Sequence, residues 1–194
     1  MKRTLIVIAS LLLCAAAYAQ NPKAADEAVV TIGSARFTVL TDRLIRMEWA
    51  ADGQFEDRAS LAIINRNLEV PAYRVSNTGD KTVIRTSSVT LTYSGNGRFT
   101  EDNLSVSFRM NGKPVTWRPG MAATGNLRGT VRTLDGIDGR FDSKTLRRFR
   151  RKGEAEKRPL EDGILSRDGW AIVDESDRHV FEKNDSDWGE WVAA

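Results

Sequence analysis

The chain has 194 residues, with 29 Lys and Arg against 26 Asp and Glu, and a formal net charge of +3. Its one cysteine is Cys14 and its one histidine is His179. This composition excludes a disulfide framework and a zinc site of the Cys/His kind, because the ligands are missing. A Ser-His-Asp triad would depend on His179, whose charged surroundings are typical of an exposed loop.

The first nineteen residues have the pattern of a secretory signal peptide. Lys2 and Arg3 form a basic start, residues 5–17 are an apolar run, and Ala17-Tyr18-Ala19 is a small-x-small cleavage site. The apolar run is shorter than the ~20 residues that cross a bilayer, so no membrane helix is expected. We therefore expect residues 1–19 to be removed, and the product to be exported to the periplasm or the extracellular space.

The rest of the chain predicts short strands joined by turns. Residues 36–40 and 44–49 alternate, with Phe37 and Val39 on one face of the first strand. One face of the second strand carries Ile45, Met47 and Trp49. Further strands are expected at residues 61–64, 73–75 and 82–86, and at Val89, Leu91 and Tyr93, which recur at a period of two.

A hairpin is predicted over residues 104–117. Apolar residues at 104, 106, 108 and 110 alternate with polar ones, and the strand ends at Asn111-Gly112, which suits the positive φ angles of a tight turn. Many short strands, with no long helical pattern except near Leu146, predict an all-β sandwich of antiparallel strands. The roughly 175 residues after the leader are enough for one domain, residues 20–194, with a two-sheet core.

Two turn triplets organise the segment that follows. Glu161-Asp162-Gly163 and Arg167-Asp168-Gly169 each combine Asp with Gly, which predicts a reversal of the chain and a positive φ at Gly169. The apolar runs 164–165 and 170–173 have the composition of strands that fill a sheet. We therefore expect residues 159–176 to form a compact segment of two turns and two short strands.

Two stretches resemble a known family. Residues 164–176 read ILSRDGWAIVDES, and residues 125–136 read GNLRGTVRTLDG. In this order they resemble two blocks of the N-terminal domain of family-31 glycoside hydrolases, the retaining α-glucosidases and α-xylosidases. Weaker similarity at residues 37–49 and 104–120 extends the resemblance over roughly residues 29–192. It implies a galactose-mutarotase-like β-sandwich that packs against a (β/α)₈ catalytic barrel, sends one loop toward the active-site mouth, and uses neither cofactor nor metal.

The resemblance also implies where the functional residues lie. Both catalytic aspartates of the family are on the barrel, which would follow residue 194, so we expect no catalytic residue in this chain and no activity from it alone. Residues 126–135 are expected nearest an oligo- or polysaccharide substrate, through Arg128, Arg132 and Asp135; the alternative is a buried turn with structural ion pairs. Trp188 and Trp191 are expected on the surface that meets the barrel.

Three other features leave alternatives open. The basic run 140–158 is either a solvated insertion or a site for phosphates, and neither nucleic acid nor membrane is an expected partner. Trp49, Trp117 and Trp170 are either core residues or platforms for sugars.

We expect the chain to be the N-terminal domain of an exported α-glycosidase. The alternative is a stand-alone, non-catalytic carbohydrate-binding sandwich; a sugar epimerase would need a histidine acid/base in a cleft.

Overall fold

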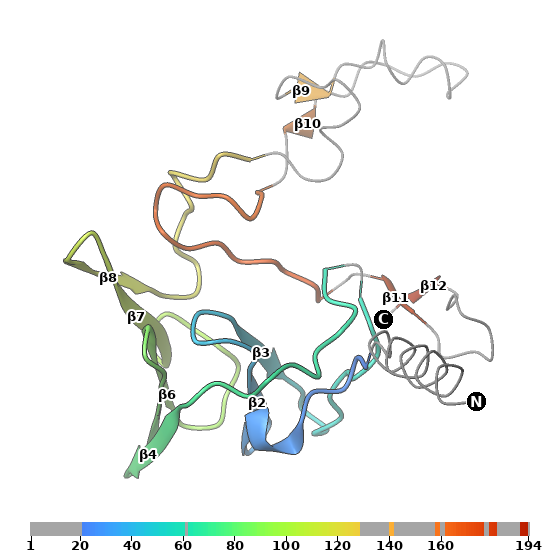
Figure 1. Ribbon diagram of the computed structural model, residues 1–194, viewed down its shortest axis with the longest axis vertical. Helices are drawn as coiled ribbons and strands as arrows, with labels where there is room; N and C mark the ends of the chain where they lie inside the picture. The colour runs from blue at the N-terminus through green and yellow to red at the C-terminus, as the bar shows by residue number, and fades with distance from the viewer. Residues whose placement is uncertain are drawn as a thin grey trace, which may run out of the picture. The chain divides into compact units, whose positions relative to one another are not determined.

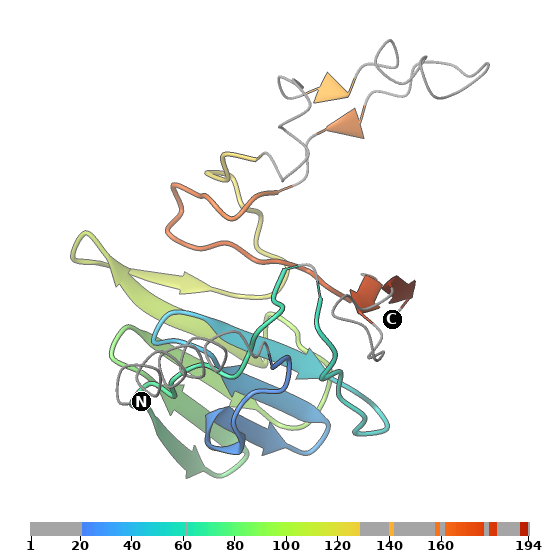
Figure 2. The same ribbon diagram turned by 45° about the vertical axis from the view of Figure 1, so that its right-hand side comes forward.

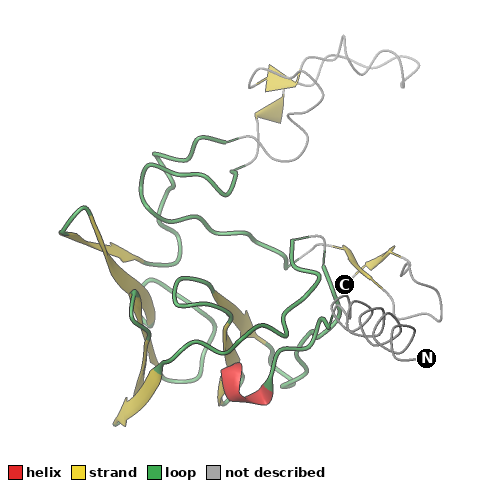
Figure 3. Cartoon of the chain, in the orientation of Figure 1, coloured by secondary structure: helices red, strands yellow, loops and turns green. Residues whose placement is uncertain are grey.

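The computed structural model describes residues 21–60, 62–128, 140–141, 158–159, 162–176, 179–181 and 191–193. These residues are mostly β, and the one helical turn among them is the 3₁₀ turn η2 (Asp26–Ala28) (Figures 1 and 3). Within this part of the chain no helix has the length and apolar character to cross a membrane. The chain divides into two compact units, Met1–Phe99 with Glu175–Ala194, and Thr100–Asp174.

The first unit contains an antiparallel sheet of strands β1 (Val29–Ile32), β2 (Ala35–Val39) and β3 (Ile45–Trp49), in that order. The register places Phe37 opposite Met47 on one face, and Arg36 opposite Glu48 on the other. This confirms the predicted strands and their apolar faces, because side chains alternate across a strand. Strand β1 was not among the predicted strands.

Strands β4 (Arg74–Thr78), β5 (Lys81–Arg85) and β6 (Val89–Ser94) also pair antiparallel in chain order. Ile84 lies opposite Leu91, and both are fully buried. The strand predicted at residues 73–75 begins at Arg74 and is longer than expected. The strand predicted at 61–64 is wrong, since the described residues 62–64 form bends and coil.

A cluster of three aromatic rings joins the two sets of strands in the first unit. Figure 2 shows the ribbons of these two sets, coloured blue to cyan and green. Phe37 of β2 and Tyr93 of β6 have ring centroids 5.4 Å apart, and Phe99 lies 5.5 Å from each. Phe37 and Tyr93 have no exposed surface. Tilted and edge-on contacts at this range are the favoured aromatic geometries. The unit is therefore all-β and sandwich-like, with its apolar core between the strands.

The first unit also includes strands β11 (His179–Phe181) and β12 (Trp191–Ala193), which pair antiparallel. Val180 is buried and bridges to Ser60, and the amide of Phe181 donates to the carbonyl of Ala59 at 2.8 Å. The backbone of His179 thus begins a strand, so the loop expected around it is wrong.

The second unit is built on the predicted hairpin. Strands β7 (Leu104–Met110) and β8 (Lys113–Trp117) pair antiparallel around Asn111 and Gly112, whose φ angles are 50° and 77°. The Asn-Gly turn is confirmed, with both residues in the left-handed region. Two further short strands, β9 (Arg140–Phe141) and β10 (Arg158–Pro159), pair with each other.

The strands predicted at 164–165 and 170–173 are wrong. Ser166 makes an isolated bridge to Asn126, and residues 170–173 belong to no strand. Ile164 and Leu165 are 77% and 66% exposed. A β-branched run becomes a strand only where a neighbouring strand supplies a ladder, and the described residues supply none here.

Replacing Phe37 with Ala should lower the free energy of unfolding by about 3–5 kcal/mol, because it empties the centre of the aromatic cluster. The matched control is Val75→Ala, since this strand residue on β4 is exposed and should change the free energy by about 1 kcal/mol or less. Urea denaturation measures both. Equal midpoints in the two variants would contradict a core centred on Phe37.

Candidate functional site

The described residues 125–128 and 164–170, which belong to the two blocks that resemble the family, lie side by side in the second unit. The amide of Leu127 donates to the carbonyl of Leu165, and the amide of Arg167 donates to the carbonyl of Gly125, each at 2.9 Å. Between these bonds Asn126 and Ser166 form an antiparallel bridge. We call the two hydrogen-bonded segments, residues 125–128 and 162–170, the clasp.

The side chain of Asn126 fastens the clasp at a second point. Its Oδ1 accepts from the amide of Gly163 at 2.9 Å and from the amide of Arg128 at 2.7 Å. Its Nδ2 donates to the carbonyl of Gly163 at 2.9 Å. The amide fixes both segments, because its oxygen and its nitrogen bond the amide and the carbonyl of the same backbone residue.

Asp168 has a structural role in the clasp. Its Oδ2 accepts from the amide of Gly125 at 2.8 Å, and its own amide donates to the hydroxyl of Ser166 at 3.1 Å. A Cβ on Gly125 would lie 2.5 Å from Oδ1 of Asp168, so the approach requires glycine there. The carboxylate of Asp168 is therefore committed to the backbone rather than to a substrate.

Gly169 orients the residue that follows it. Its φ of 77° confirms the predicted left-handed turn, and a Cβ would lie 2.5 Å from Sδ of Met110 and 3.2 Å from Cε2 of Phe108. The turn packs tightly on β7 and delivers Trp170, whose ring centroid is 6.2 Å from that of Trp117 on β8. Trp117 is buried, whereas Trp170 is half-buried.

These two tryptophans wall a cavity of about 240 Å³. It is smaller than the ~300–1,000 Å³ of a pocket for a drug-sized ligand, so it suits a single small ring or part of a chain. Indole and thioether groups supply an apolar wall, and the carboxylate of Asp162 is its one acidic group. The remaining lining residues are Gly120, Met121, Ala122, Ala123, Asn126 and Ile172.

The structure places Arg128, one of the predicted site residues, next to this cavity. Its Nε is 4.0 Å from Oδ1 of Asp162, a lining residue, and both side chains are about half exposed, at 53% and 49%. Arg128 has a φ of 56°, which is uncommon for a residue with a side chain. An ion pair this exposed adds little stability, so its charges are available to a ligand.

The side chains of the other predicted site residues are not among those that the structure describes. Arg132, Asp135 and Trp188 lie outside the described residues, as do the leader and most of the basic run 140–158, and of Trp191 only the backbone is described, in β12. Asp162 was not predicted to line a cavity, because its turn triplet does not indicate which side chains it meets.

Comparison of the chain with protein-family models found no match, and comparison with curated proteins found none either. Among the described residues, no three His, Cys, Asp or Glu side chains gather closely enough to hold a metal ion. The arrangement offers aromatic stacking, one carboxylate and one guanidinium, which is the chemistry of binding a polar ring compound.

Replacing Gly169 with Ala should destabilise the chain by about 1–3 kcal/mol more than replacing Gly120 with Ala. Both glycines have φ near 80°, at 77° and 84°, but a Cβ on Gly120 meets nothing within 4 Å. The comparison therefore separates the clash with Met110 from backbone strain. Equal denaturation midpoints in the two variants would show that the clasp does not pack on β7.

Proposed function

We propose that this chain is the non-catalytic, N-terminal domain of an exported retaining α-glycosidase, with a galactose-mutarotase-like sandwich fold. In this proposal the clasp cavity contacts an α-linked glucoside or xyloside, and a separate catalytic barrel hydrolyses it. No cofactor takes part. The all-β, sandwich-like character of the first unit is compatible with such a domain.

The clasp is the observation that carries the proposal. Residues 125–128 and 162–170 are far apart in the chain; residues 125–128 belong to one block that resembles the family, and residues 164–170 belong to the other. They are hydrogen-bonded to each other, beside a cavity lined by Trp117 and Trp170. Motifs that serve one site are expected to meet in this way, whereas two chance similarities are not.

The cavity chemistry supports contact with a sugar rather than its hydrolysis. An indole ring offers a flat apolar face to the C–H face of a pyranose, and Asp162 and Arg128 offer an acceptor and donors for its hydroxyls. A retaining glycosidase needs two carboxyl groups about 5 Å apart. Asp162 is the one carboxylate among the residues that line the cavity, so the proposal places both catalytic aspartates on the barrel.

Exposed apolar side chains support the barrel as a partner. Leu127, Ile164 and Leu165 of the clasp are all more than half exposed, and Met121, Ile172 and Val173 near it are also exposed. Large apolar side chains left in water beside a candidate site are typical of a surface that another domain covers. Trp188 and Trp191 remain predicted members of that surface.

The second candidate is a stand-alone carbohydrate-binding sandwich. The cavity with its two tryptophans favours it, because such a cavity can bind a sugar without any barrel. The two candidates differ in whether another domain covers the clasp. In a stand-alone module the exposed leucines and isoleucine of the clasp stay in water, whereas in a glycosidase domain the barrel covers them.

The purified chain should bind maltotriose or an α-xyloside saturably, but should not hydrolyse 4-nitrophenyl α-glucoside or α-xyloside. Titration followed by NMR of the indole N–H groups measures binding. Trp170→Ala should weaken it by about five- to tenfold, because stacking is lost. Asp162→Asn should also weaken it, and its exposed position keeps the fold intact.

Trp49→Ala is the matched control. Trp49 lies in the first unit, where its Nε1 donates to the carbonyl of Asn96 and Arg98 covers its ring, so its loss should leave sugar binding unchanged. Turnover at an enzymatic rate that Asp162→Asn abolishes would overturn the non-catalytic assignment. No saturable binding of either sugar would overturn the role of the cavity.

A further inference from the structure

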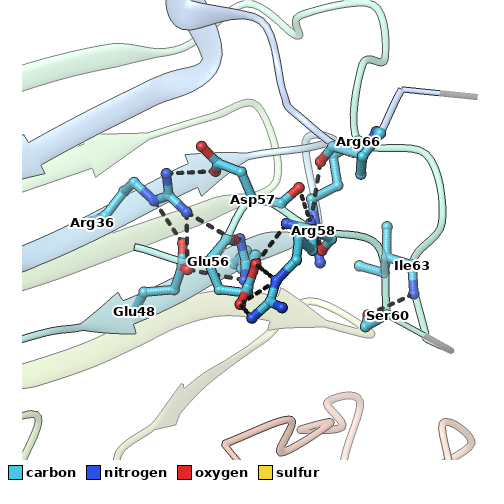
Figure 4. Close-up of polar contacts among 10 residues, drawn as sticks. Arg36, Glu48, Glu56, Asp57, Arg58, Ser60, Ile63 and Arg66 are labelled. Atoms are coloured by element: carbon cyan, nitrogen blue, oxygen red, sulfur yellow. Dashed lines mark hydrogen bonds and ion pairs between the residues drawn. The ribbon is translucent and has the colours of Figure 1, made fainter. Parts of the chain in front are cut away.

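A layer of charged side chains lies on the outer face of the first sheet (Figure 4). Arg36 on β2 and Arg46 with Glu48 on β3 point away from the aromatic core, because they alternate with Phe37 and Met47. Asp57 and Arg66, from the segment after β3, contribute to the same layer. Such a layer is stable only where each buried charge and each donor has a partner.

Arg36 is fully compensated. Its Nε and Nη2 donate to the two carboxylate oxygens of Glu48 at 2.8 and 3.0 Å, and its Nη1 donates to Oδ1 of Asp57 at 2.7 Å. Burial opposes its charge, but the hydrogen bonds and charges of Glu48 and then Asp57 raise its pKa overall. Two carboxylates therefore serve this one guanidinium.

Arg46 and Arg66 are less well compensated. Arg46 shares Oε1 of Glu48 with Arg36, at 2.9 Å, and donates to the carbonyl of Glu56 at 2.7 Å. Arg66 is 2% exposed, and its Nη1 donates to backbone carbonyls, the shortest bond being 2.8 Å to Arg58. Burial is the largest cause that lowers the pKa of both side chains, and the charge of Arg36 lowers both further.

Nε of Arg66 is buried with no hydrogen-bond partner among the described residues. Arg66 lines a cavity of about 200 Å³ together with Arg36, Arg46 and Lys23, whose Nζ is 3.5 Å from Asp26. The lining residues carry four positive groups, and the carboxylates that act on them are Asp26 and Asp57 in the lining, Glu48, which pairs with Arg36 and Arg46, and Glu175, whose charge acts on Arg46 and Arg66. The volume equals the share of about six or seven water molecules in the liquid.

We propose that this cavity binds a small oxyanion, a phosphate or carboxylate group, which accepts the Nε–H of Arg66 and lies beside Arg46 and Lys23. An oxygen acceptor there satisfies the one buried side-chain donor that has no partner in the described part of the chain, and Arg46 and Lys23 in the same lining supply further positively charged donors. Guanidinium groups bind both planar carboxylates and phosphates through paired N–H donors. The bound anion would hold the segment at Lys23 against β2.

The test is a titration of the full chain with inorganic phosphate at constant ionic strength, with chloride as the balancing anion. NMR of the arginine Nε–H groups should show a saturable shift of the Arg66 signal. The thermal midpoint should rise with phosphate as expected for a ligand that binds only the folded state. A second titration uses acetate. If acetate shifts the Arg66 signal, the site binds oxyanions in general; if it does not, the site is specific for phosphate.

Two variants make the test specific. Lys23→Gln should weaken phosphate binding by about two- to fivefold, since this exposed cation stands at the cavity. Arg85→Gln removes an exposed charge from β5 and should leave the affinity unchanged. Arg66→Lys keeps the charge and removes Nε–H, so it should abolish the rise of the thermal midpoint with phosphate.

If Arg66→Lys fails to fold, the Nε–H titration of the unmodified chain and the Lys23→Gln comparison still decide the matter. A stationary Arg66 signal in both phosphate and acetate would overturn the proposal, and would assign the cavity to water. Equal weakening of phosphate binding by Lys23→Gln and Arg85→Gln would also overturn the proposal. Such a result would show that phosphate responds to the net charge of the chain and not to this cavity.

Discussion

The candidate site depends on the hydrogen bonds between Asn126 and Gly163. One side-chain amide accepts from and donates to the backbone of a residue on the opposite segment, so the two halves of the clasp cannot slide past each other. Asp162 is brought to the cavity by this constraint, and Arg128 is brought to Asp162. Asp168 and Gly125 hold the other end, where the turn at Gly169 presents Trp170 to Trp117.

In the first unit, β2 has an apolar face and a charged face that are both buried. Phe37 packs between the strands, whereas Arg36 lies under the segment that carries Asp57 and Arg66. A strand covered on both sides must satisfy every polar group that it buries. Arg36 meets this requirement, whereas Nε of Arg66, on the segment that covers β2, has no partner among the described residues, and this is the basis of the proposed oxyanion site.

Local rules predicted the parts of the structure that depend on a few adjacent residues. The left-handed angles at Asn111, Gly112 and Gly169, and the apolar face of β2, follow from residue type and alternation. The strands expected at 164–165 and 170–173 were wrong because a strand also needs a distant partner, which its own composition does not specify. Cavity residues such as Asp162, and the charged layer around Arg66, depend on contacts between segments far apart in sequence, so alternation and turn signals could not reveal them.

The central claim is that this chain is one domain of an α-glycosidase and uses the clasp to meet its catalytic barrel. The most direct measurement is size-exclusion chromatography with light scattering on the chain, alone and mixed with a separately expressed barrel domain if the downstream reading frame encodes one. The account predicts self-association of the chain alone, because Ile164, Leu165 and Leu127 are exposed, and a one-to-one complex with the barrel. A stable monomer at high concentration that ignores the barrel would contradict the account and favour a stand-alone binding module.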